Sequence, residues 1–147
     1  MACNCGRKSA AQKYNYITQT LTATPAPLDM GASAGLPSGP SIVDRGNNLG
    51  VGRTGLYRIT AQAILAVTTA GTVNLQAYYD GVPIVAARKS RPAVVGSTEI
   101  TLDNLVYLVV PDSCCNSVTL PVDIYAWTDD SAVATVSSIT VNLLKEA

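Results

Sequence analysis

A strict alternation of apolar and polar side chains constrains the fold of this chain more than any other feature. Between residues 57 and 67 every odd position is apolar, and polar side chains such as Arg58 and Gln62 stand on the other parity. The apolar series is Tyr57, Ile59, Ala61, Ala63, Leu65 and Val67. Because successive side chains of a strand point to opposite faces, this period of two predicts a half-buried β-strand. The pattern recurs at residues 72–79, 118–127 and 132–144.

Turn residues separate the alternating segments. Asp80-Gly81 predicts a tight hairpin, and Asp129-Asp130-Ser131 predicts a turn before the last strand. The strand after the hairpin holds Pro83 near its start, which is tolerated only at a sheet edge or at the beginning of a strand. Amphipathic helical stretches of useful length are missing from the sequence. About eight strand candidates therefore predict an all-β antiparallel sandwich or barrel.

The segment from residue 97 to 110 departs from the strict alternation. Its apolar residues are Ile100, Leu102, Leu105, Tyr107 and Val109. Their parity shifts between Leu102 and Leu105, and a β-bulge produces such a shift by adding one residue to a strand. We therefore expect a bulge or turn at Asp103-Asn104, within one bent strand or between two short ones.

The length of 147 residues matches the commonest size of a single domain, so one core is expected. Residues 1–13 are polar and positively charged, whereas residues 14–21 have the aromatic and β-branched composition of a strand. Residues 24–40 contain four prolines and three glycines and are expected to form a long surface loop. We assign residues 1–24 to an extended N-terminal arm that serves for attachment, and residues 25–147 to the β domain.

Composition argues against several classes of function. His, the commonest general base and metal ligand, is absent, and the spacing of the other residues indicates no nucleophile-base pair, so neither an enzyme nor a cofactor is expected. The formal net charge of +0 provides no field to attract nucleic acid or an anionic membrane. Apolar runs are too short for a membrane-spanning helix, and the N-terminus lacks the apolar core of a secretion signal. Charged residues make up only 14%, so much of the surface is expected to lie in an assembly.

Four cysteines occur as two close pairs, Cys3-x-Cys5 and Cys114-Cys115. Four thiolates suffice in number for a structural zinc site, but neither pair has the usual interval between ligands. Free thiols are the first expectation for a chain made in a reducing cytosol. A disulfide between the arm and the loop, or between subunits, is the second alternative, and zinc is the third.

Two features could contact a ligand. Arg88, Lys89 and Arg91 form a short basic cluster that could bind phosphate or acidic side chains, although three charges on a loop are usually solvated. Trp127 lies near a strand end, where it could serve as a sugar platform, but aromatic residues more often fill interfaces or cores.

Several strands carry apolar or aromatic side chains on the nominally outer face. These are Leu56, Ile64, Tyr78, Tyr125, Trp127 and Leu144. A lone monomer would expose them, so an interface between subunits is one explanation. Scattered exposed apolar residues, or a second buried face, are the other.

Three segments in a fixed order carry a family resemblance. They are Gly-Leu-Tyr-Arg-Ile from residue 55, the hairpin segment Tyr78-Tyr79-Asp80-Gly81-Val82-Pro83-Ile84, and the final Val-Asn-Leu-Leu from residue 141. This order resembles the jelly roll of the tumour-necrosis-factor and complement-C1q type over about residues 41–145. The resemblance implies an antiparallel jelly-roll sandwich that assembles as a compact homotrimer. In such a trimer aromatic and aliphatic side chains of the inner sheet line the threefold axis, and the candidates here are Tyr57, Tyr107, Tyr125 and Leu144.

Small domains of this type resemble the trimeric head-fibre and capsid-decoration proteins of tailed bacteriophages. The resemblance implies a structural virion protein that is made in the host cytoplasm and contacts the major capsid protein or another virion protein. The attachment element would be the basic arm, with Cys3, Cys5, Arg7, Lys8 and Lys13. The alternative is a C1q-like module at a cell or spore surface that binds carbohydrate or a receptor.

Overall fold

The computed structural model describes residues 9–31, 39, 41–111 and 118–147. Over these residues the chain forms ten β-strands in two antiparallel sheets. Helices are missing from the described part of the chain, so none there is long and apolar enough to cross a membrane. The prediction of an all-β antiparallel jelly-roll sandwich is confirmed.

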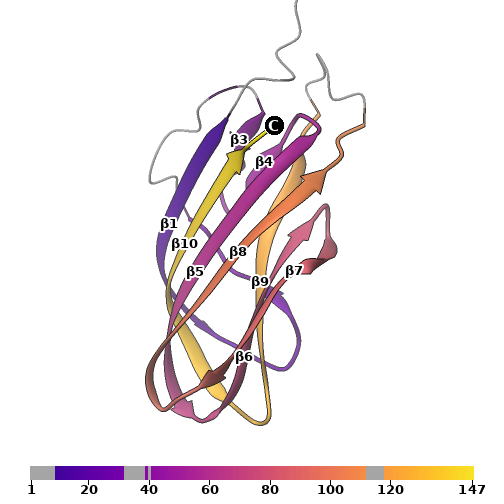
Figure 1. The fold of residues 1–147 in the computed structure, drawn as a ribbon. Helices are drawn as coiled ribbons and strands as arrows, with labels where there is room; N and C mark the ends of the chain where they lie inside the picture. Colours follow the sequence, from indigo (N-terminus) through magenta and orange to yellow (C-terminus); the bar gives the residue numbers. More distant parts are fainter. Residues whose placement is uncertain (1–8, 32–38, 40, 112–117) are drawn as a thin grey trace, which may run out of the picture.

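Sheet A has four strands in the order β1-β10-β5-β8, and sheet B has the order β3-β4-β9-β6-β7 with β2 also paired to β9. The strands of sheet A are β1 (Ala10–Thr20), β10 (Val133–Lys145), β5 (Gly55–Thr69) and β8 (Gly96–Leu108). Those of sheet B are β2 (Ala26–Pro27), β3 (Ile42–Asp44), β4 (Leu49–Val51), β6 (Gly71–Tyr79), β7 (Val82–Ala93) and β9 (Leu120–Asp129). Figure 1 shows β1, β10, β5 and β8 side by side in front of the strands of sheet B.

The core lies between the two sheets and is made by the alternation in the sequence. Sheet A contributes the inward series of β5 that starts at Tyr57, together with Leu102 of β8 and Val141 of β10. Sheet B contributes residues such as Leu75 and Ile124. Each fully buried aliphatic side chain of this kind stabilises the fold by roughly 1.5–3 kcal/mol.

The predicted hairpin is confirmed. Asp80 and Gly81 have φ values of 52° and 78°, and they join β6 to β7 where Tyr79 pairs with Val82. Two successive positive φ values match the right-handed twist of the flanking strands, and glycine adopts them at no steric cost. The strand β7 is the edge of sheet B and Pro83 is its second residue, so both of the predicted alternatives for this proline hold.

The expected bulge at Asp103-Asn104 is wrong. The strands β5 and β8 pair without interruption from Gly55 opposite Leu108 to Val67 opposite Gly96. Leu102 therefore points into the core, whereas Leu105, Tyr107 and Val109 are exposed. The parity seemed to shift because the second half of β8 has apolar residues on its outer side.

The strand predicted at residues 14–21 is confirmed, but it begins earlier, at Ala10. The strand β1 is an integral edge strand of sheet A, paired with β10, so the sandwich begins near residue 10 and not at residue 25. Within the expected loop at 24–40, β2 pairs with β9 on the same side as β4 and farther along that strand. Leu28 and Met30, which follow β2, are fully buried in the core. Residues 24–31 are thus a structural part of the sandwich.

Candidate functional site

The outer face of sheet A, called here the sheet A face, presents an apolar cluster to solvent. Leu144 of β10 and Leu105 of β8 flank Arg58 of β5, and Leu56 pairs with Tyr107 in the next row. Tyr107 is 66% exposed, Leu105 49% and Leu144 37%. A contiguous apolar group on an exposed face is typical of a protein interaction site.

A small ion network lies in the middle of this cluster. The Arg58 guanidinium is 3.3 Å from the Asp103 carboxylate and 3.4 Å from that of Glu146. The groups are solvent-exposed, so each pair contributes only about 0–1 kcal/mol to the stability of one chain. One guanidinium pairs with two carboxylates, so the network keeps a net negative charge, but covering paired charges costs less than covering unpaired ones.

A second apolar group lies farther along the sheet A face. Tyr16 of β1 and Ile64 of β5 are joined through Ser138 of β10, which pairs with both of them. The ring of Tyr16 is 79% exposed and packs edge to face on Tyr14 at a centroid distance of 4.9 Å. The sheet A face therefore carries exposed apolar side chains on all four strands.

The four residues predicted to line the subunit interface fall in three different places. Tyr107 and Leu144 lie on the sheet A face. Tyr57 is fully buried, with its hydroxyl donating to the carbonyl of Arg53 at 2.6 Å, so it belongs to the core and cannot touch a partner. Tyr125 lies in sheet B, stacked on Tyr78 at 3.6 Å between centroids, so it is on a different face from Tyr107.

The predicted basic cluster is divided among different contacts. Arg88 places its guanidinium over the ring of Trp127, 4.9 Å from the centroid. Arg91 donates to the carbonyl of Glu99 and so ties the edge of sheet B to β8, while Lys89 is exposed. Trp127 is only 7% exposed, so its indole is not available as an open sugar platform.

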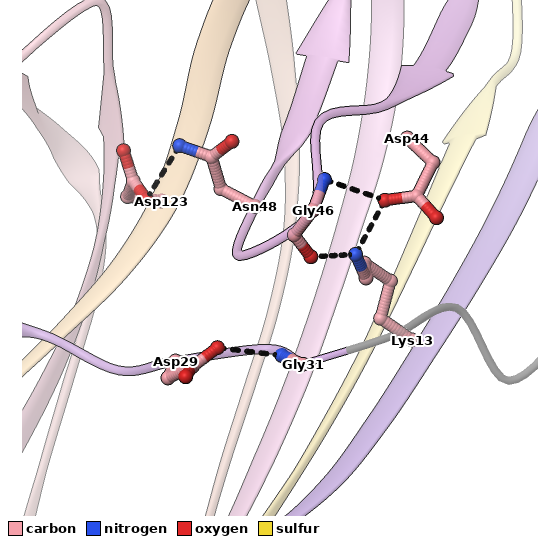
Figure 2. A network of polar contacts seen from close by, with 7 residues as sticks. All are labelled: Lys13, Asp29, Gly31, Asp44, Gly46, Asn48 and Asp123. Atoms are coloured by element: carbon pink, nitrogen blue, oxygen red, sulfur yellow. Dashed lines mark hydrogen bonds and ion pairs between the residues drawn. The ribbon is translucent and has the colours of Figure 1, made fainter.

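A polar network joins β1 to the turn between β3 and β4. Figure 2 shows Lys13 Nζ between the Asp44 carboxylate, at 2.5 Å, and the carbonyl of Gly46. Hydrogen bonds from Lys13 and from the backbone of Gly46 hold the pKa of Asp44 below its usual value. Lys13 is fully buried, so it links the two sheets and is not part of an attachment surface, which corrects that prediction.

A pocket of about 250 Å³ opens beside the same turn, between residues of β2, β9 and the β3–β4 turn. It is lined by Pro27, Leu28, Asp29, Asn47 and Asp123, and is called here the Asp123 pocket. Sequence reasoning missed this site. Its signals were weak, since Asp29 stands in a Pro-rich segment and Asp123 occupies an ordinary outer position of an alternating strand.

The other predicted attachment and zinc residues, Cys3, Cys5, Arg7, Lys8, Cys114 and Cys115, lie outside the described residues. Within the described part of the chain, the acidic side chains form no cluster of three or more that could hold a metal ion. Free thiols, a disulfide and zinc all stay open as alternatives for the cysteines.

Comparison with known proteins identifies the fold. No family model and no curated protein matches the chain. Among solved structures, the PRD1 vertex protein P5 matches with a TM-score of 0.63 and 16% identity, over 93% of this chain and 96% of that one. Murine APRIL at pH 5.0 matches with a TM-score of 0.62 and 11% identity, over 95% and 99%.

Both matches span almost the whole of each chain, so the similarity covers the entire sandwich and not a local motif. APRIL is a jelly-roll protein of the tumour-necrosis-factor family. The chain therefore has the jelly-roll fold of these two proteins, and the predicted resemblance to the tumour-necrosis-factor type is confirmed for the fold. At these identities the comparison establishes the fold alone.

Proposed function

We propose that this protein is a structural component of a phage virion that assembles as a homotrimer through the sheet A face. The exposed apolar cluster of Leu56, Leu105, Tyr107 and Leu144 carries the proposal. The fold shared with the PRD1 vertex protein P5 supports the virion assignment, because that protein is by name a component of a virion vertex. The protein is a non-enzymatic assembly module in this account.

The chemistry of the sheet A face suits a contact between copies of the chain. Interface cores are enriched in Tyr and Arg, and the cluster contains one of each, Tyr107 and Arg58. The second apolar group, with Tyr16 and Ile64, lies on the same face and extends the surface that a neighbouring copy can cover. Three copies packed in this way bury Tyr107 and Leu105 near the common axis.

Attachment to the capsid is assigned to the segment that precedes the sandwich. Since β1 belongs to sheet A, this segment is residues 1–8, with Cys3, Cys5, Arg7 and Lys8. Its two basic side chains fit an acidic surface on the major capsid protein or another virion protein. Decoration of the capsid, or projection from it, follows from an attachment by one end of the domain.

The trimer is tested by replacing Leu105 and Tyr107 together with Ser. We expect the native mass in solution to fall from three times the 15.3 kDa chain mass to one chain, because the substitutions remove the centre of the apolar cluster. The matched control is Val133→Ser, which changes a 45% exposed apolar residue at the far end of sheet A and should leave the trimer intact. A double variant that keeps the wild-type mass would overturn the assignment of the interface.

The attachment is tested separately, with Arg7→Glu and Lys8→Glu together. The variant should remain trimeric and should fail to cosediment with capsids of the same virus, because its arm repels an acidic surface. The control Lys89→Glu reverses an exposed charge on β7 and should cosediment normally. Equal cosedimentation of both variants would contradict attachment through the basic arm.

A further inference from the structure

The Asp123 pocket lies in sheet B, away from the sheet A face, and within a single chain. Its acidic groups come from two elements, with Asp123 on β9 and Asp29 just after β2. Asn47 closes it from the β3–β4 turn, and Pro27 and Leu28 supply an apolar wall. The pocket therefore combines hydrogen-bonding groups with a small apolar surface and does not depend on the proposed trimer.

Both carboxylates of the pocket are held in place by the protein. Asp29 Oδ1 accepts from the backbone N–H of Gly31 at 2.8 Å, and Asp123 Oδ1 accepts from the Asn48 amide at 3.0 Å, as Figure 2 shows. Each carboxylate keeps a second oxygen that accepts no hydrogen bond within the described part of the chain. These oxygens are fixed acceptors for a ligand that brings its own donors.

The loop that carries Asp29 is itself rigidly placed. Asn15 of β1 donates from its amide to the carbonyl of Asp29 at 3.0 Å. Gly31 has a φ of +64°, and a Cβ there would come within 2.5 Å of the Asn15 side chain, so only glycine fits. The backbone at Asp29 and Gly31 is thus held against β1 of sheet A, and the N–H of Gly31 in turn holds the Asp29 carboxylate.

An aromatic pair stands next to the pocket. Tyr78 lies directly across from Asp123 on the neighbouring strand, and Tyr125 pairs with Pro27. The two rings stack with an interplanar angle of 11°. Burial, followed by the charge of Asp123 and the nearby Tyr78, raises the pKa of Tyr125, so its hydroxyl stays protonated and can donate.

We infer that the Asp123 pocket binds a neutral sugar. Sugar hydroxyls are donors that match the two free carboxylate oxygens, and the Asn47 amide offers both a donor and an acceptor. Pro27 offers apolar surface to the C–H side of a sugar ring, and the stacked tyrosines lie beside the pocket without lining it. The pocket is smaller than the roughly 300–1,000 Å³ of sites for drug-sized ligands, so it holds one ring at a time.

The charge of the site selects against other small ligands. Two carboxylates without a cation among the lining residues repel acidic sugars and phosphates. A metal ion is disfavoured, because Asp29 and Asp123 belong to no cluster of three or more metal-ligating side chains within the described residues. A small ammonium ion is the remaining competitor, and the experiment separates it from a sugar.

The test is a titration of the full-length, isotope-labelled protein, followed by amide chemical shifts. The probes are glucose, galactose, mannose and N-acetylglucosamine, with methylammonium chloride as the competing cation, each up to about 50 mM. We expect saturable shifts at Asn47, Asp123 and Tyr125 with at least one sugar, and a Kd in the millimolar range. Saturation by methylammonium alone, or by none of the probes, would overturn the inference.

Variants locate the binding site. Asp123→Asn and Asn47→Ala should each weaken sugar binding about tenfold or more, since each removes a polar partner of the ring. The matched control Asp130→Asn changes an exposed carboxylate in the β9–β10 turn and should bind as the wild type does. Equal binding by Asp123→Asn, Asn47→Ala and the control would place the sugar elsewhere. All lining residues of the pocket belong to one chain, so the sugar titration does not depend on the trimer. A failed titration leaves the trimer proposal standing, and a failed trimer test leaves the sugar proposal standing.

Discussion

The outer faces of the two sheets carry similar aromatic and apolar residues, which differ in how far other side chains cover them. On sheet A, Tyr107 and Leu105 stand open to solvent. On sheet B, the guanidinium of Arg88 covers Trp127, and Tyr78 and Tyr125 stack on each other. An aromatic residue on an outer face therefore indicates an interface only when its own sheet leaves it uncovered.

The largest expected effect concerns the difference between Tyr57 and Tyr107, which the sequence placed in one interface. Tyr57→Ala should lower the free energy of unfolding by about 3–5 kcal/mol, because it empties a fully buried site. Tyr107→Ala should change the stability of one chain by less than about 0.5 kcal/mol. Urea denaturation at a concentration where the protein is monomeric measures both values. Similar losses for the two variants would contradict their assignment to core and surface.

The substitution Asp44→Asn tests the ion pair between Lys13 and Asp44 that links the two sheets. The variant should lose about 1–3 kcal/mol at pH 7, because buried Lys13 loses its counter-charge. The folded pKa of Asp44 lies below its ordinary value of 3.8, so its stabilising effect is complete well above pH 3.8 and is lost as the pH falls below that value. Thermal unfolding followed from about pH 7 to about pH 2 should therefore show a smaller acid-induced loss of stability in the variant. A parallel pH dependence in both proteins would argue against the ion pair.

Removal of the cover over Trp127 tests the sheet B face. Arg88→Ala should lower stability by about 0.5–1 kcal/mol and should shift the tryptophan emission to longer wavelength as water reaches the indole. The chain has a single tryptophan, so the spectrum reports this site alone. Lys89→Ala, its exposed neighbour, is the control, and an unchanged spectrum in Arg88→Ala would show that the indole has other cover.

The smallest effect is expected at the ion network of the sheet A face. Arg58→Met should change the stability of one chain by no more than about 1 kcal/mol, because the pairs with Asp103 and Glu146 are exposed. In the trimer the same substitution leaves two carboxylates without their partner inside the interface, so dissociation should occur at higher protein concentration than in the wild type. Measurement of the mass across a dilution series distinguishes the two effects.

The sequence predicted the sandwich well where alternation was strict. The series that begins at Tyr57, the hairpin at Asp80-Gly81 and the final strand all occur as expected, because one buried face fixes the register of each strand. It failed on β8, where apolar residues on both faces gave a false shift in parity.

The sites were harder to predict, since they depend on which strands become neighbours. The parity of β5 placed Tyr57 on one side of its strand but could not say that this side faces the core. Lys13 looked like part of a basic arm until Asp44, from the opposite sheet, came within 2.5 Å of it. The Asp123 pocket brings together three segments distant in sequence, and their approach follows from the pairing of β2 and β4 with β9.

The central claim is that the uncovered apolar cluster on sheet A joins three copies of the chain. The most direct measurement is the native mass of the full-length wild-type protein by sedimentation equilibrium, with reductant present so that cysteine cross-links cannot contribute. The account predicts one species at three times the 15.3 kDa chain mass at the higher protein concentrations, which dissociates to single chains only on strong dilution. A single-chain mass at every concentration would contradict it.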